Sequence, residues 1–280
     1  MEEQLNDYEI MQVSNDTSII AVDAVERANV DSQVATAKQY PRDIKRCLTN
    51  SIVMATMDYD TAQSCGYALP RGGKPITGPS VHLAKLIVSN FGNIRAEAKV
   101  VRITDKQVIS RGTCWDLENN VATAFEVSRS IVGKGGKRFS DDMITVTGNA
   151  ANAIAYRNAV FAVIPKAITD KVYKAAQSFI TGDLSDEDQL IRRRQKCIDF
   201  FRNEYAITEQ EVIMLCGKQT INQIGASEIA LLLGITQSLK DGDTTVEEVM
   251  KPYRKEENRK TIAEKAAEAE KAQKEKEEKK

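Results

Sequence analysis

The stretch Glu126-Val-Ser-Arg-Ser-Ile-Val-Gly-Lys-Gly-Gly-Lys-Arg-Phe139 carries a strand-like run into a glycine-rich basic ribbon, just before a long helical segment. Its glycines permit positive φ angles and a close approach of the backbone to a phosphate. Lys134, Lys137 and Arg138 add positive charge at the tip. An exposed hairpin turn uses the same residue types. The ribbon is therefore either a nucleic-acid contact or an ordinary solvated loop.

Residues 95–103, 107–117 and 121–132 form three strand-like runs, of which the third leads into the ribbon. The segments that join them, 104–106 and 118–120, are short enough for an antiparallel meander. Alternation along the third run gives one face of small and polar side chains, which are Ala122, Ala124, Glu126, Ser128 and Ser130. Such a face admits a backbone or stacked bases, although a plain solvated sheet face is the alternative.

A long helix is predicted over residues 140–164, because Ser140 suits an N-cap and a proline follows the last residue. Asn149, Asn152 and Tyr156 fall on one stripe of this helix. Asn and Tyr side chains suit hydrogen bonds to a backbone, a base edge or a neighbouring subunit. Arg157 is the only charged residue beyond the first turn. We expect it to contact a phosphate, or else to pair with a core carboxylate.

The remaining patterns divide the chain into parts. Apolar spacing predicts helices over 42–57 and 81–90, whereas the Pro/Gly density of residues 67–75 predicts a loop. The acidic segment 182–188 reads as a linker. The predicted fold is α+β, with an antiparallel β-meander packed with helices and a small all-helical C-terminal domain. The expected parts are an acidic N-terminal segment (1–40), a nucleic-acid-binding core (41–182), a helical partner-binding domain (186–250) and a charged Ala/Glu/Lys tail (251–280).

Charge is distributed unevenly, although the net charge of the whole chain is −1. Residues 41–180 hold 19 basic and 11 acidic side chains, a net of +8, whereas 1–40 and 181–250 each carry a net of −6. This asymmetry is typical of a protein whose partner carries phosphates. No apolar run approaches the roughly 18 residues of a membrane span, and the acidic N-terminus is unlike a signal peptide. The five cysteines form no CxxC pair. We therefore expect a cytoplasmic protein with reduced cysteines.

Enzymatic chemistry has little support in the sequence. The single histidine, His82, lies among apolar residues of a predicted helix, which favours a structural role. No zinc-ligand spacing, Walker-type loop or GxSxG motif occurs. We therefore expect no catalytic residue, no bound metal and no cofactor, and we expect that the protein is not an enzyme.

The order of parts resembles the phage single-strand annealing proteins of the RecT and Redβ type. The resemblance rests on the basic meander, the helix end Arg157-Asn-Ala-Val-Phe-Ala-Val-Ile-Pro165, the acidic linker and the small domain that ends in Ser238-Leu-Lys-Asp-Gly-Asp-Thr-Thr-Val246. It implies binding of single-stranded DNA without ATP, oligomerisation on that DNA, and annealing of complementary strands in phage recombination inside the bacterial host cell. It also implies that the C-terminal domain recruits a single-strand-binding protein or an exonuclease.

The residues and the resemblance together define a candidate nucleic-acid interface. Its members are Arg71, Lys74, Arg129, Lys134, Lys137, Arg138, Phe139, Asn149, Asn152, Tyr156, Arg157, Lys166, Lys171 and Lys174. Aromatic side chains such as Trp115, Phe139 and Tyr156 could stack on bases. Two other functions remain open, a phage assembly or scaffolding protein and a nuclease accessory subunit.

Overall fold

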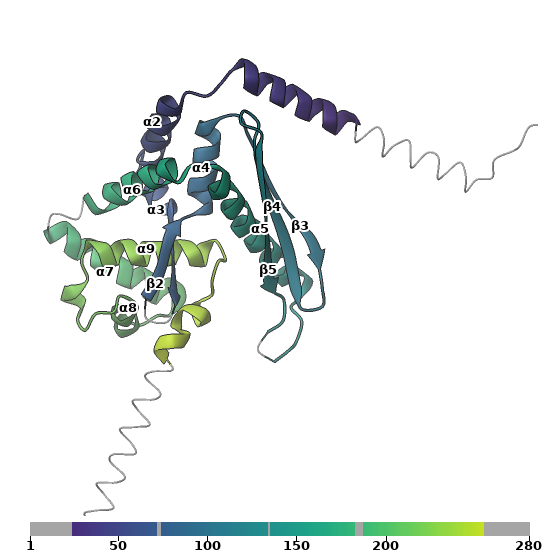
Figure 1. The fold of residues 1–280 in the computed structure, drawn as a ribbon. Helices are drawn as coiled ribbons and strands as arrows, with labels where there is room; N and C mark the ends of the chain where they lie inside the picture. Colours follow the sequence, from purple (N-terminus) through teal and green to yellow (C-terminus); the bar gives the residue numbers. More distant parts are fainter. Residues whose placement is uncertain (1–23, 72–73, 134, 183–186, 255–280) are drawn as a thin grey trace, which may run out of the picture.

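A three-stranded sheet lies on one side of the computed structural model, which describes residues 24–71, 74–133, 135–182 and 187–254 (Figure 1). Strands β3 (Ile94–Ile103), β4 (Gln107–Asp116) and β5 (Val121–Ser130) pair antiparallel in the order β3-β4-β5. The predicted meander and the α+β class are confirmed. Pairing shifts between Val100 and Arg102, where β3 has a bulge that the alternation of the sequence does not predict.

Helix α5 (Asp141–Val163) lies along one face of this sheet (Figure 1). The Ser140 hydroxyl accepts a hydrogen bond from the Met143 amide, so the predicted N-cap is confirmed. The helix approaches β4 very closely, because a Cβ added at Gly112 would overlap the carbonyl group of Ala155. Glycine is therefore required at this position to seat the helix on the sheet.

Four further helices build the first hydrophobic core beside α5. They are α2 (Ile44–Ala55), α3 (Tyr59–Ser64), α4 (Val81–Phe91) and α6 (Lys166–Gly182). Arg42, just before α2, ties this core to the sheet, since its buried guanidinium forms ion pairs with Asp116 and Glu118. The same group lies 4.3 Å from the centre of the Phe91 ring. Such a buried cation is tolerated because it is fully paired.

The sequence predicts a loop over residues 67–75, but residues 67–71 and 74–75 lie in a β-hairpin. Strands β1 (Gly66–Arg71) and β2 (Lys74–Pro79) pair antiparallel with Pro70 opposite Pro75. The loop prediction is therefore wrong. Proline is compatible with a two-stranded ribbon because each strand has a free edge, where no backbone amide has to be donated. The side chains of Arg71 and Lys74 lie outside the described part of the structure.

The C-terminal helices form a second core that rests on this hairpin. They are α7 (Glu187–Tyr205), α8 (Glu209–Leu215) and α9 (Ala226–Lys240), with a short 3-10 turn at Ile221–Gln223. The Thr208–Glu211 capping box is present at α8. The Ser238 hydroxyl bonds the backbone of Ala68, accepting from its amide at 3.2 Å and donating to its carbonyl at 2.9 Å. Ala68 belongs to the second core, so the hairpin packs together with the C-terminal helices. The predicted domain boundary at residues 182–186 therefore stays a prediction.

Helical residues 24–39 project from the top of the molecule, away from the two cores (Figure 1). Residues 1–23, Lys134, the linker residues 183–186 and residues 255–280 lie outside the described residues. None of the described helices is both long and apolar enough to cross a membrane. The five cysteines are unpaired and four of them are buried, as expected of small apolar residues.

Candidate nucleic-acid interface

The sheet has one covered and one open face. Val108, Ser110 and Gly112 of the central strand β4 are buried beneath α5. The side chains between them point to the opposite side, where β5 contributes the small and polar row from Ala122 to Ser130. Every member of that row is exposed. The two-faced sheet inferred from alternation is therefore present, and its small-residue face is the open one.

The open face is positively charged. The register places four basic and two acidic side chains on it, namely Arg95, Lys99, Arg102 and Arg111 against Glu97 and Glu126. Within the described part of the chain, none of these basic groups is in an ion pair. Unpaired cations beside one another raise the local potential and attract phosphates.

Lys99 and Arg111 lie directly opposite each other on β3 and β4. Like charges at directly opposed positions destabilise a sheet. Glu126 faces Arg111 from the other neighbouring strand and offsets only part of this repulsion. An anion bound between the two cations would relieve the remainder, so this row is the candidate centre of the interface.

Trp115 supplies an aromatic ring on the same face. It lies between Arg95 on β3 and Ala122 on β5, and its side chain is half-buried. Its indole nitrogen is buried without a hydrogen-bond partner among the described residues, so only part of the ring reaches the surface, with Ala122 on one side and the positive charge of Arg95 on the other. An aromatic ring beside a basic side chain suits a base and the phosphate next to it.

The ribbon tip adjoins one end of this face. The Ile131 amide donates to the Lys106 carbonyl at 2.9 Å, which holds the ribbon against the β3–β4 turn. Arg138 donates to the Thr104 carbonyl at 3.2 Å, and its only described carboxylate, Asp105, is 4.0 Å away. Lys137 is exposed. The tip therefore extends the positive surface beyond the end of the strands.

Phe139 does not take part in that surface. Its ring is half-buried against a small apolar cluster that includes Ile131 and Ile144. The predicted stacking role thus has no support in the geometry, and Phe139 instead fixes the base of the ribbon to α5.

The polar stripe of α5 faces the sheet and the core more than solvent. Asn149 is exposed, but the Oδ1 atom of Asn152 is buried and has no hydrogen-bond partner in the described structure. Tyr156 packs against the first core, and burial raises the pKa of its hydroxyl. The stripe turns inward because the glycine contacts with β4 draw this side of the helix onto the sheet. Of the three residues, only Asn149 is fully exposed, whereas Asn152 and Tyr156 are half-buried.

Arg157 and Arg129 anchor the loop after α9 instead of facing solvent. The Arg157 guanidinium is 3.4 Å from the carboxylate of Asp243, and Arg129 donates to the Asp243 carbonyl at 3.0 Å. The side chains of the ion pair are only 12% and 7% exposed. Nearby, His82 is 3.0 Å from Asp241, in keeping with its expected structural role. Of the two roles considered for Arg157, the structure shows the ion pair with a buried carboxylate.

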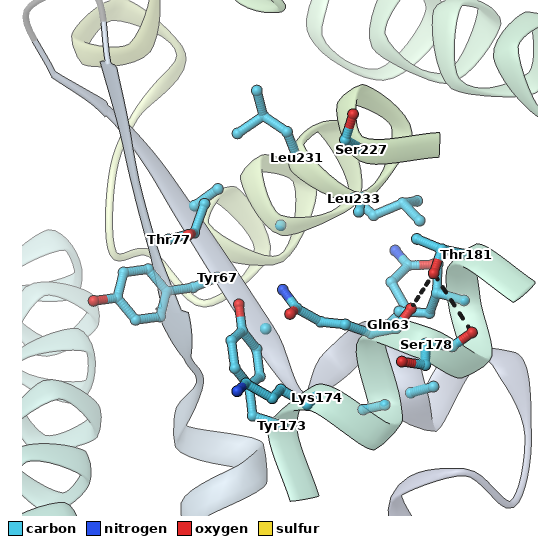
Figure 2. A pocket seen from close by; sticks show the side chains of 18 residues that line it. Gln63, Tyr67, Thr77, Tyr173, Lys174, Ser178, Thr181, Ser227, Leu231 and Leu233 are labelled. Carbon is cyan, nitrogen blue, oxygen red and sulfur yellow. Dashed lines mark hydrogen bonds between the residues drawn. The ribbon is translucent and has the colours of Figure 1, made fainter. Parts of the chain in front are cut away.

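The basic residues of α6 lie on another part of the molecule. Lys166 pairs with Asp170 at 2.7 Å, and Lys171 is exposed. Lys174 lines a pocket of about 500 Å³ between α3, β1, α6 and α9, which Tyr173 and Gln63 also line (Figure 2). Burial raises the pKa of Tyr173 to about 12. The described contacts of the α6 lysines therefore do not connect them to the open face of the sheet.

The most exposed cations of the sheet are not among the residues that the sequence singles out. Lys99 and Arg111 could have been found, because a three-stranded meander with short turns fixes their register and brings them together. Arg102 could not have been found in this way, because the bulge at Val101 shifts which residues of β3 point to each face just before it. The local glycine and lysine content predicts the ribbon tip. The charge of the open face can be predicted only from the pairing of the strands.

No family model matches the chain, and no curated protein or solved structure is significantly similar to it.

Proposed function

We propose that the protein binds single-stranded DNA without ATP through the open face of β3-β4-β5 and the adjoining ribbon tip, and that it anneals complementary strands. The observation that carries this proposal is the set of four cations, none in an ion pair with another described residue, on an open sheet face that also bears Trp115 and a row of small side chains. The resemblance to the RecT and Redβ type of annealing protein supports the same function. Under this proposal the protein is not an enzyme and oligomerises on DNA.

The geometry suggests how such a surface would act. Phosphates would follow the basic row across β3 and β4, and bases would lie over β5 and against Trp115. The small side chains of β5 leave room for bases without clamping them. Because α5 covers only the opposite face, nothing in the described structure encloses a strand from above. A strand held from one side keeps its pairing edges accessible, which is what annealing to a second strand requires.

Replacing Lys99 and Arg111 together by alanine is expected to weaken binding of an oligo-dT strand and to flatten its salt dependence. The slope of log K against log salt should fall in magnitude by about 0.7 for each phosphate that the variant no longer neutralises. Fluorescence anisotropy over a salt series measures this effect. Lys45→Ala/Lys251→Ala, at exposed sites on α2 and just after the helices of the α9 domain, removes the same charge elsewhere and should leave the slope near that of the parent. Equal slopes for both double variants would contradict the assignment of this face.

Trp115→Ala is expected to reduce affinity for the same strand by about 1–3 kcal/mol, the usual contribution of one stacked base. Trp115→Phe should recover most of that loss because it keeps an aromatic face. Quenching of the fluorescence of Trp115, the single tryptophan of the chain, provides an independent readout in the parent protein. Unchanged fluorescence on saturation with oligo-dT would place the DNA elsewhere.

Competition with duplex DNA separates this function from its rivals. An annealing protein should prefer single strands and should speed the pairing of complementary oligonucleotides without ATP. Weak binding of single and double strands alike, together with no acceleration of pairing, would favour the assembly or nuclease-accessory roles instead.

A further inference from the structure

The open face of β3-β4-β5 has no covering element among the described residues, and its four cations have no ionic partner there. The chain itself contains a stretch of opposite charge. Residues 1–23 hold six acidic side chains and no basic one, whereas residues 255–280, at the other end of the chain, mix both signs. Charge complementarity therefore selects residues 1–23 as the segment of this chain that suits the open face.

The helix over residues 24–39 joins this acidic segment to the sheet. The side-chain amide of Asn93, the residue just before β3, donates to the Tyr40 carbonyl at 3.0 Å. This bond holds the end of the helix beside the start of β3. Arg95 and Trp115 lie opposite each other at the same end of the sheet. The acidic segment is thus tethered near the aromatic end of the open face.

The acidic segment is also long enough to reach the whole face. An extended chain spans about 3.3 Å per residue, so residues 1–23 extend over ~75 Å. The helix over residues 24–39 is about 24 Å long, and a strand of ten residues is about 33 Å long. Even from the far end of the helix, the segment can therefore reach every basic side chain of the open face.

Asp7-Tyr8-Glu9 is the part of the segment whose chemistry matches the face most closely. An aromatic ring between two carboxylates presents the same order of groups as a base between two phosphates. The Trp115 ring can pack against the Tyr8 ring. The Arg95 guanidinium, on the neighbouring strand, can then pair with one of the flanking carboxylates. The features that suit a strand of DNA thus suit this tripeptide as well.

We propose that residues 1–23 occupy the open face when no DNA is bound, with Tyr8 placed against Trp115. The carboxylates on either side of Tyr8 then pair with Arg95 and its basic neighbours on the face. The segment competes with single-stranded DNA for the same cations and so lowers the apparent affinity of the protein for weakly held strands. This inference rests on the proposed function, to which it adds a competitor that belongs to the chain itself.

Asp7→Asn/Glu9→Gln in the full chain is expected to tighten binding of oligo-dT by about threefold or more at low salt, because two ion pairs of the competing segment are lost. The difference from the parent should fade at high salt, which screens the same contacts in the parent. The matched control is Glu187→Gln/Glu204→Gln, which removes the same charge from exposed sites on α7. The control should stay within about twofold of the parent. Fluorescence anisotropy measures all three proteins.

Quenching of Trp115 by acrylamide, without DNA, tests the contact itself. Trp115 is the single tryptophan of the chain, so the signal reports on this face alone. Tyr8→Ala should raise the quenching constant, because the ring that covers Trp115 is removed. Asp7→Asn/Glu9→Gln should raise it as well, whereas the α7 control should leave it at the parental value.

Each combination of results decides the proposal. Tighter DNA binding together with stronger quenching in the segment variants supports it. Tighter DNA binding with unchanged quenching overturns it, because the carboxylates then act at long range and not by contact. Unchanged DNA binding in a parent that binds oligo-dT overturns the competition whatever the quenching shows. If neither the parent nor any variant binds oligo-dT while the quenching rises, the proposed function fails and the contact of the segment with the face stands, so the two failures are distinguishable.

Discussion

Arg157→Ala is expected to lower the free energy of unfolding by about 3–5 kcal/mol, the usual cost of removing one partner from a buried ion pair. The change leaves the Asp243 carboxylate, which is only 7% exposed, without its cation. It also removes the guanidinium from the face of Tyr67, which lies 4.4 Å away. Urea unfolding followed by circular dichroism measures the loss. Arg111→Ala, an exposed change on the sheet, should stay within about 0.5 kcal/mol of the parent.

The acidity of Asp243 adds a pH signature to this prediction. Burial raises the pKa of Asp243 above its ordinary value of 3.8, although Arg157 acts in the opposite direction. A carboxyl whose folded pKa is raised costs stability above that raised value, and the cost disappears as pH falls below the ordinary value. Removing Arg157 raises the folded pKa further. The deficit of Arg157→Ala should therefore be largest near neutral pH and should shrink as the solution is acidified.

A double-mutant cycle separates the pair from a role in DNA binding. Asp243→Ala should cost much less in the Arg157→Ala background than in the parent, because the buried charge is then absent as well. If Arg157→Ala instead retained parental stability and lost only oligo-dT affinity, the guanidinium would be a phosphate contact. The ion pair would then contribute little to the free energy of unfolding.

Much of the fold follows from local sequence. The meander is predictable because its turns are short and its strands alternate, and α5 is predictable because Ser140 and Pro165 mark its ends. The β1–β2 hairpin is not predictable from the same signals. Its Gly and Pro content favours a loop, and the strands are held by α9, whose Gly234 lies against the backbone of Ala68. That contact joins residues far apart in the chain, so no local pattern contains it.

The candidate site divides in the same way. The ribbon tip is recognisable from its own residues, and Lys137 and Arg138 lie at the surface. Arg157 stands out because it is isolated in its helix, but isolation in sequence says nothing about a distant partner, and Asp243 supplies one. The open face requires strand register, which pairs Lys99 with Arg111. Basic residues that are brought together only by strand pairing are thus the part of the candidate site that is hardest to predict from sequence.

Gly112→Ala is expected to destabilise the protein by about 1–3 kcal/mol or more, the cost of overpacking a site that cannot adjust. The added methyl group would overlap the Ala155 carbonyl, which is helix backbone and has no alternative rotamer. Relief requires α5 to move away from β4, which would also disturb the opposite face of the same strand, where Arg111 lies. We therefore expect oligo-dT affinity to fall together with stability.

The matched control for this change is Gly135→Ala at the ribbon tip. A Cβ at that position has no neighbour within 4 Å, so the change should leave stability near the parental value. Thermal unfolding compares the two variants, and each differs from the parent by the same single methyl group. Parental stability in Gly112→Ala would mean that α5 and the sheet are more loosely packed than their contacts indicate. The close packing of α5 on β4 could then no longer explain why its polar stripe faces the sheet.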